Sequence, residues 1–186
     1  MSNRGVTLVE VIITIAISSI ILVCLTEMVF FMDNQQKNMI ARIELQQNLT
    51  MALDSIAADV ENSRDVIGYG DSNLLAKSLN LRKVRLNRQG ETYDQRIDYQ
   101  LAIDPMEGQH LFPLKGKVLY RKTDGGQNQP IANFITDLTF EYLDSDNKIC
   151  TNSHQAEKVI IMIQGEVNND IIQYQQVKCL EKKRWP

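Results

Sequence analysis

The stretch that decides the fold is Arg4-Gly5-Val6-Thr7-Leu8-Val9-Glu10, which stands directly before a long apolar run. The run from Val11 to Thr26 has 16 residues without a charge, and 12 of them are apolar. As a helix it would cover about 24 Å, which is short of the roughly 30 Å hydrocarbon core of a bilayer. Extending the helix back to Val6 gives 21 residues. Such a helix is about 31 Å long, so the sequence predicts a membrane-spanning helix that includes Glu10.

Glu10 is the exceptional residue of this helix. An ionisable group costs roughly 2.5–3.5 kcal/mol at mid-bilayer, less near a helix end, and marks a candidate functional position. A cut after Gly5 would create an ammonium group four peptide bonds from the carboxylate, and pairing the two charges would relieve the cost of both. The competing interpretation is an uncleaved signal anchor that tolerates one Glu near its end.

Ordinary export signals fit this N-terminus poorly. A secretory signal is cut at small residues after the apolar stretch, and Cys24-Leu25-Thr26-Glu27-Met28 offers no such site. A lipoprotein signal would need a small residue before Cys24, where Val23 stands. The small residue, Gly5, precedes the apolar run instead.

This order of leader, Val6–Glu10 segment and apolar helix resembles the class III signal of type IV prepilins and pseudopilins. The resemblance implies that Arg4 is the basic leader residue and that a prepilin peptidase cuts after Gly5 on the cytoplasmic face. It also implies that Val6 becomes the methylated N-terminus, and that Glu10 pairs with a free N-terminal amine, commonly a neighbour's, during filament assembly. Major pilins usually carry Phe at the position of Val6, so this departure favours a minor subunit.

Length and charge leave room for one stem and one small domain. Removing residues 1–5 from the 186 leaves 181 residues, and the net charge of the whole chain is −3. This is enough for a stem and one domain of roughly 120 residues with its own core. The only basic tract, Lys182-Lys183-Arg184, is at the extreme end, so nucleic acid is not an expected direct partner.

The three cysteines have different expected roles. Cys24 falls in the apolar helix and is interpreted as a small buried residue. Cys150 and Cys179 would both lie outside the cytoplasm if Arg4 stays inside, where a disulfide can persist. They form a candidate disulfide, nominally worth about 3–4 kcal/mol for such a long loop.

The N-terminal third carries no helix breaker. Pro is absent before Pro105 and Gly is absent between Gly5 and Gly68, so a helix can run from Val6 to about Ser63. Its second half has an apolar stripe, which is expected to pack on the sheet of its own domain rather than form a coiled-coil seam. The stripe consists of Leu49, Leu53, Ile56 and Val60, continued backwards by Ile43 and Met39.

Beyond residue 80 the pattern changes to alternation with period two, which indicates strands. The expected strands lie at 79–86, 97–103, 118–121, 138–142, 159–163 and 171–177, separated by turns at 89–91, 124–126, 144–147 and 168–169. The fold class is therefore α+β, with an antiparallel sheet on the C-terminal half of the stem. The expected divisions are a leader (1–5), a transmembrane and assembly helix (6–32), an amphipathic stem helix (33–64) and a globular β domain (65–186).

The globular part also resembles a known group, though loosely. The segments 56–64, 118–121, 130–132 and 134–142, followed by a final apolar hairpin, are similar to the W-type minor pilins and J-type minor pseudopilins. The resemblance implies a pilin-like domain packed on the stem.

Candidate catalytic and metal sites are few. His110 and His154, the only histidines, have no metal ligand at a suitable spacing. The turn at Asp144, Asp146 and Asn147 suggests calcium, but Lys148 and Ile149 stand where an EF-hand loop needs a ligand and a glycine. No nucleophile–base pair or phosphate loop stands out, so we expect no enzyme activity, no metal and no cofactor.

Two functional hypotheses remain. The first is a structural minor pilin or pseudopilin, placed in the inner membrane with its C-terminal domain outside the cytoplasm and then built into a filament. Its expected partners are prepilin peptidase, other pilin or pseudopilin subunits, the membrane and an inner-membrane assembly platform. The alternative is a single-pass anchored binding module, such as an adhesin or a DNA-uptake receptor, that does not polymerise. Gly5-Val6 discriminates them, since cleavage there makes sense only for assembly.

Overall fold

The computed structural model describes residues 7–67, 77–86, 89–103, 114, 116–150 and 155–180. The chain divides into two compact units, Met1–Ile40 and Ala41–Pro186. The predicted leader and cleavage residues Arg4, Gly5 and Val6 lie outside the described residues, as do both histidines and the loop expected at 68–72.

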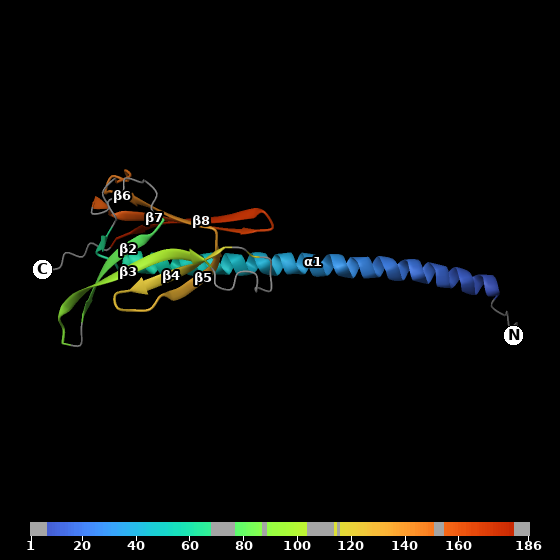
Figure 1. Cartoon of the computed structure of the whole chain (residues 1–186). Coiled ribbons are helices and arrows are strands. Elements are labelled where there is room, and N and C mark those ends of the chain that lie inside the picture. Colours follow the sequence, from blue (N-terminus) through green and yellow to red (C-terminus); the bar gives the residue numbers. More distant parts are fainter. Residues whose placement is uncertain are drawn as a thin grey trace. The chain divides into compact units, whose positions relative to one another are not determined.

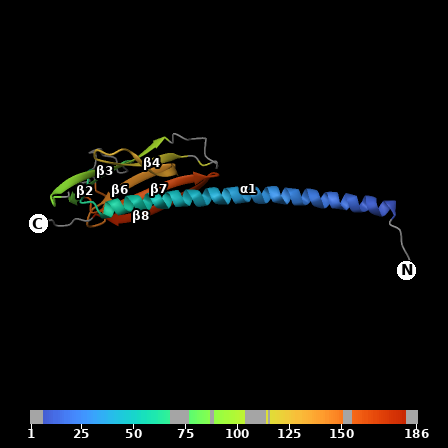
Figure 2. The same cartoon turned by 90° about the horizontal axis from the view of Figure 1, so that it is seen from below.

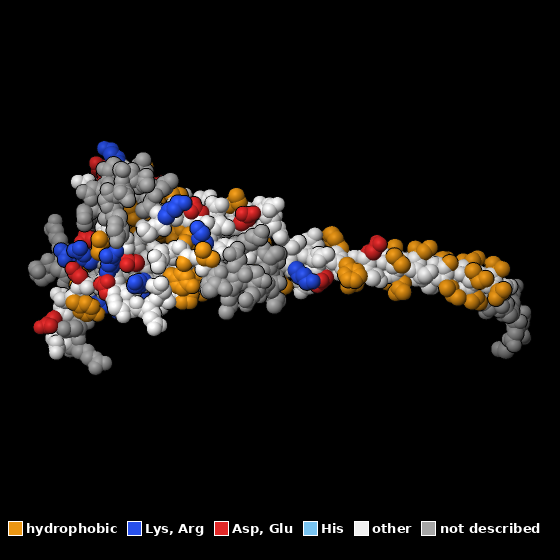
Figure 3. All heavy atoms as spheres, viewed as in Figure 1, with side chains coloured by type: hydrophobic (Ala, Val, Ile, Leu, Met, Phe, Trp, Pro, Cys, Tyr) orange, Lys and Arg blue, Asp and Glu red, His pale blue; other side chains and the backbone are white. Residues whose placement is uncertain are grey.

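One helix, α1 (Leu8–Glu61), accounts for the predicted breaker-free stretch. Three hydroxyl side chains in its apolar part bond back to backbone carbonyls about one turn earlier. Thr14 Oγ1 donates to the Glu10 carbonyl at 2.7 Å, Ser19 Oγ to Ala16 at 2.8 Å, and Thr26 Oγ1 to Leu22 at 2.8 Å. The side chains of the first unit are exposed throughout its described part, and Figure 3 shows them as mainly hydrophobic.

Within the described residues, eight strands form two antiparallel sheets around the C-terminal half of α1, and Figures 1 and 2 show their arrangement. The first sheet has the order β1-β2-β3-β4-β5 and the second β6-β7-β8. Their bounds are β1 Asp65–Val66, β2 Leu79–Leu86, β3 Thr92–Ile103, β4 Lys117–Thr123, β5 Gln129–Ile135, β6 Asp137–Leu143, β7 Lys158–Val167 and β8 Asp170–Cys179. The predicted α+β class, with a long apolar helix and antiparallel pairing, is confirmed.

Two of the hairpin turns contain residues that tolerate the positive φ values found there. Asn168 and Asn169 have φ values of 51° and 67° and close the β7–β8 hairpin. Two consecutive positive values define a type I′ turn, which Asn tolerates better than other non-glycine residues. Gly90, between β2 and β3, has a φ of 82° for the same reason. The predicted turns at 89–91 and 168–169 are therefore confirmed.

The core lies where α1 meets the sheets. The helix buries one face, and the two largest fully buried side chains are Tyr99 of β3 and Phe140 of β6. The buried helical residues are Ala41, Leu45, Leu49, Ala52, Ile56, Ala57, Asp59 and Val60. The backward extension of the predicted stripe was wrong: Met39 and Ile43 are 66% and 42% exposed, and the buried face continues through Leu45 and Ala41.

A glycine sets how closely the helix approaches the second sheet. A Cβ atom on Gly165, in β7, would lie 2.6 Å from Leu45 Cδ1 and 3.1 Å from the Phe134 carbonyl oxygen. A side chain at position 165 would therefore displace Leu45 and crowd the Phe134 carbonyl.

Two features of the sheet plan differ from the prediction. The strands form two sheets rather than one, and β1 and β5 are additional strands. The β1 strand has only two residues, which gives too little alternation to detect. The β5 strand contains Pro130, which lowers strand propensity but is tolerated because β5 is an edge strand.

Candidate functional site: the N-terminal assembly segment

Thr7 and Glu10 form a reciprocal pair at the start of α1. The Glu10 amide donates to Thr7 Oγ1 at 3.4 Å, while the Thr7 amide donates to Glu10 Oε2 at 3.3 Å. The Thr7 hydroxyl also lies 3.3 Å from Glu10 Oε2. This arrangement is a capping box, with Thr7 as N-cap and Glu10 three residues later. It satisfies two backbone amides that a helix start leaves without carbonyl partners.

The capping box gives the Glu10 carboxylate a partner inside its own chain. A negative charge in the first turn is also favoured by the positive end of the helix dipole. Both effects lower the cost of holding the carboxylate at the edge of an apolar helix.

The helix that follows is suited to a bilayer. Among the described residues, α1 is the one helix long and apolar enough to span a membrane, and none of its apolar 18-residue window is buried. Figure 3 shows hydrophobic side chains all round the visible face of this segment, with few charges. Such a surface requires lipid or other helices around it.

Residues 1–23 match the family described as the prokaryotic N-terminal methylation motif. The N-terminus is a class III prepilin signal. The match includes Gly5, Val6, both residues of the capping box and most of the apolar run from Val11 to Thr26. No match was found among curated proteins or among solved structures.

The structure describes only one of the residues predicted to act in this prepilin signal. Glu10 is described and engaged with Thr7, whereas the cleavage junction Gly5-Val6 lies before the first described residue. Thr7 was not identified as a site residue. The sequence nevertheless contains a signal for this residue, because Thr-x-x-Glu before an apolar run is the signature of a capping box.

Cys150 and Cys179 are not joined by a disulfide in this structure, which corrects the predicted pairing. The Cys150 amide donates to the Tyr142 carbonyl at 2.8 Å, so Cys150 lies beyond the outer edge of β6. Cys179 pairs with Lys158 from the far side of β7. Three strand spacings therefore separate them, which is about 14 Å. A disulfide needs Cα atoms within about 7 Å.

A buried polar cluster joins α1 to the first sheet, and it was not predicted from the sequence. Asp59 is 8% exposed. Its Oδ2 accepts from Arg121 Nε at 2.6 Å and from the Tyr99 hydroxyl at 2.8 Å. Lys83 Nζ lies 3.6 Å from Oδ1. The four residues come from α1, β4, β3 and β2, so one carboxylate connects the helix to three strands.

The electrostatics of this cluster favour the ionised carboxylate. Burial alone would raise the pKa of Asp59, but hydrogen bonds from Arg121 and Tyr99 and the charges of Arg121 and Lys83 hold that pKa below its usual value. Burial raises the pKa of the Tyr99 hydroxyl, and the neighbouring Asp59 charge raises it further. The cluster is thus a neutral donor and two cations around one anion. This composition is suited to holding a helix in place.

The acidic turn at 144–147 uses its oxygens internally. Asp144 Oδ1 accepts from the Asp146 amide at 2.9 Å and the Lys148 amide at 2.8 Å. Asn147 Oδ1 accepts from Lys158 Nζ at 2.5 Å. Within the described part of the chain, no three His, Cys, Asp or Glu side chains converge as a metal site would require. The turn is explained by its own hydrogen bonds.

Proposed function

We propose that this protein is a structural subunit, a minor pilin or pseudopilin, of a type IV pilus-like filament. The observation that carries the proposal is the prepilin signal at residues 1–23, whose Glu10 stands in a capping box directly before an uncovered apolar helix. A prepilin peptidase would cut after Gly5 and methylate Val6. The role is assembly rather than catalysis.

Glu10 would change partners during assembly. In the single subunit its carboxylate accepts from the Thr7 amide at 3.3 Å. In a filament it would pair with the N-terminal ammonium group of another subunit, because an ammonium offers a charged partner where the amide offers a neutral one. A Glu10 carboxylate without a partner would be energetically costly in a bundle of apolar helices.

The apolar helix would provide the packing surface. Residues Val6 to Thr26 would exchange lipid contacts for contacts with other stems, and small residues such as Ala16, Ser18 and Ser19 let helices approach closely. Before assembly the protein would sit in the inner membrane with its C-terminal domain outside the cytoplasm. Its partners would be the peptidase, other subunits and a membrane assembly platform.

The N-terminus of the mature protein tests this proposal. Mass spectrometry of the N-terminal peptide, from membranes or sheared filaments, is expected to give N-methylated Val6. Gly5→Val should block the cut, whereas the leader substitution Ser2→Ala should leave it intact. Finding Met1 or Ser2 at the terminus of the mature pool would overturn the proposal.

A second experiment distinguishes a filament subunit from an anchored binding module. Glu10→Ala removes a charge from the apolar helix, so membrane insertion should be unchanged or improved. Incorporation into filaments should nonetheless fall, because a neighbour's ammonium loses its partner. Assembly at the wild-type level would contradict the pairing role of Glu10.

A further inference from the structure

The edges of the two sheets differ in how they are protected against pairing with a further strand. At one edge of the first sheet, β1 has only two residues. At the other edge, β5 contains Pro130, and its Asn133 amide donates to Asn48 Oδ1 of α1 at 3.0 Å. In the second sheet, the end of β6 is met by the turn through Ile149 and Cys150. Short strands, prolines and covering segments are the usual means of preventing unwanted strand addition.

The remaining edge, β8, has none of these protections among the described residues. It has ten residues and contains no proline, and Ile171 to Val177 carry no charge. Among the described residues, the backbone hydrogen bonds of Asp170 to Cys179 go to β7. Its other side therefore presents a row of backbone donors and acceptors, and only another backbone can satisfy such a row regularly.

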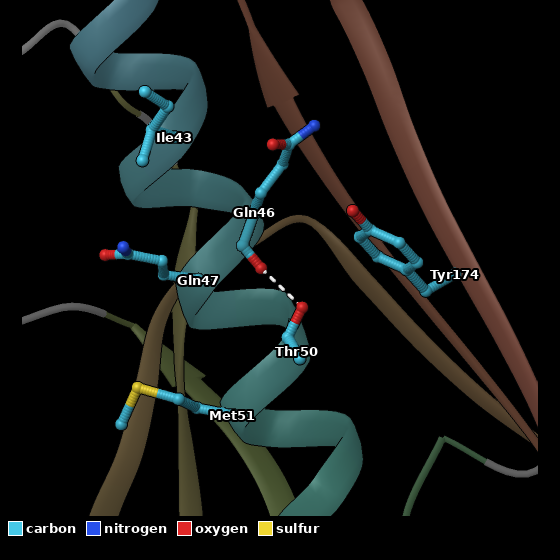
Figure 4. A pocket seen from close by; sticks show the side chains of 6 residues that line it. All are labelled: Ile43, Gln46, Gln47, Thr50, Met51 and Tyr174. Atoms are coloured by element: carbon cyan, nitrogen blue, oxygen red, sulfur yellow. Dashed lines mark hydrogen bonds between the residues drawn. The ribbon is translucent and has the colours of Figure 1, made fainter.

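An open groove of about 410 Å³ lies beside this strand. Figure 4 shows Tyr174 of β8 on one side and α1 on the other, with the Thr50 hydroxyl bonded to the Gln46 carbonyl. All six lining residues are uncharged: Ile43, Gln46, Gln47, Thr50, Met51 and Tyr174. Ile43 and Met51 are 42% and 61% exposed. The groove thus offers apolar contact and amide hydrogen bonds but no counter-charge.

Gln176 adds an unsatisfied polar atom on the same strand. Its side-chain oxygen Oε1 is buried and has no hydrogen-bond partner within the described residues. In native protein structures, buried hydrogen-bond acceptors nearly always have a partner. The strand next to the groove therefore carries both an unused backbone edge and an unused side-chain acceptor.

We propose that the free edge of β8 accepts an extended, uncharged segment of a neighbouring filament subunit, which adds as a fourth strand to the β6-β7-β8 sheet. The added strand would hydrogen-bond to the β8 backbone and place alternate side chains over the groove beside Tyr174. An acidic or basic segment is disfavoured, because nothing in the groove would pair with its charge. That the partner is a filament subunit rests on the proposed function above.

The direction of β8 excludes one occupant, an antiparallel copy of the same strand. Lys178 Nζ lies 2.6 Å from Glu61 Oε1 near the end of α1, while Tyr174 lies beside Gln46 and Thr50. The strand thus runs in the same direction as the helix. An antiparallel β8 pair would reverse the helix of the second subunit, whereas subunits that leave one membrane must keep their helices in one direction.

A peptide experiment tests the edge without requiring filaments. The probe is an acetylated and amidated peptide with the sequence of residues 171–177, added to the full chain in detergent micelles. Amide hydrogen exchange of residues 170–179 should slow by about tenfold at roughly ten times the peptide's Kd, at the amides that do not bond to β7. A peptide with Pro at the position of Tyr174 should give no slowing. Equal effects of both peptides, or none from either, would overturn the proposal.

Two lysine variants separate the edge from the outer face of the sheet. Gln175→Lys places a charge on β8 and should abolish the peptide effect. Gln164→Lys, on the central strand β7, should retain it. Exchange of the β6–β7 ladder amides reports folding in both variants. Loss of the effect in both folded variants would show that the face rather than the edge binds, and would overturn the proposal.

Exchange in sheared filaments then tests the partner. The outward amides of β8 should exchange more slowly in filaments than in micelles. If filaments form with Val6 at the N-terminus but β8 exchanges equally fast in both, the inference falls and the proposed function stands. If Gly5 is not cut, the proposed function falls, and the peptide experiment still decides the edge.

Discussion

At the scale of single residues, Glu10 has one observed role, which follows from its position three residues after Thr7, and one proposed role. Its carboxylate closes a capping box within the chain, and in the proposed assembly it would pair with the N-terminal ammonium group of another subunit. The exchange is favourable only if the box is weak enough to open. The 3.3–3.4 Å distances fit that requirement, since charge-assisted hydrogen bonds are usually shorter.

Replacing Thr7 should loosen the start of the helix without altering its apolar surface. Thr7→Val removes the hydroxyl that accepts from the Glu10 amide, and we expect a loss of about 1 kcal/mol in the local stability of the first turn. Amide exchange of residues 8–11 in micelles measures this loss. Thr7→Ser keeps the hydroxyl and is the matched control. Equal exchange in Thr7→Val and wild type would show that the cap contributes nothing.

Asp59 should make the stability of the domain sensitive to acid. Its folded pKa lies below the unfolded value of 3.8, so the stabilisation is complete above that value and is lost as the pH falls through the folded pKa. Asp59→Asn should cost about 2 kcal/mol at neutral pH, since it weakens hydrogen bonds to a charged group. The free energy of unfolding of the variant should also depend less on pH in the acid range.

Urea unfolding of the full chain in micelles, followed at several pH values, checks this prediction. The variant and wild type should differ most at neutral pH and converge as the pH falls through the folded pKa of Asp59. Asp124→Asn is a suitable control, because Asp124 bonds to the exposed Arg96 amide away from the cluster. A constant difference at all pH values would contradict the role given to the carboxylate.

At the scale of elements, the contact between α1 and β7 depends on the absence of one side chain. Gly165→Ala would place a Cβ 2.6 Å from Leu45 Cδ1 and 3.1 Å from the Phe134 carbonyl. We expect a loss of about 1–3 kcal/mol, the usual cost of overpacking.

A double-mutant cycle with Leu45→Ala isolates the steric part of that loss. Leu45→Ala alone should cost about 2–5 kcal/mol through the cavity it leaves. The pair should cost less than the sum of the single changes, because the new methyl group enters the space that Leu45 vacates. Urea midpoints of the four proteins measure the coupling, and strict additivity would argue against a direct contact.

The elements themselves could largely be predicted from the sequence, but their partners could not. Period-two patterns found six of the strands, and Asn168-Asn169 predicted its hairpin because both residues tolerate positive φ. The helix face was misjudged toward its start, because Ala41 is too small to mark a buried face whereas Met39 is apolar yet exposed. Asp59 was unpredictable for another reason: its partner Arg121 lies 62 residues away in the chain.

At the scale of the whole molecule, the two compact units differ in whether they bury their own apolar side chains. The second has its own core, whereas the described part of the first buries no side chain. The first unit is therefore stable only in lipid, detergent or contact with other helices. The boundary between the two units, at Ile40 and Ala41, falls inside the helix.

The second unit should hold together without a disulfide. Cys150 and Cys179 are separated by β6 and β7, so peptide maps of protein from an oxidising compartment should be the same with and without reductant. Replacing both by Ser should change the unfolding midpoint by less than about 0.5 kcal/mol in equivalent free energy. A peptide that links the two cysteines would contradict the strand order.

The back-bonded hydroxyls of Thr14, Ser19 and Thr26 have a mechanical consequence. Because each hydroxyl is already paired within its own helix, moving the helix out of lipid neither breaks nor creates these bonds. The work of extraction would then depend mainly on the apolar area and on the charges, Glu10 among them. The force needed to pull such a helix out of the membrane would therefore change gradually with the length that remains in lipid.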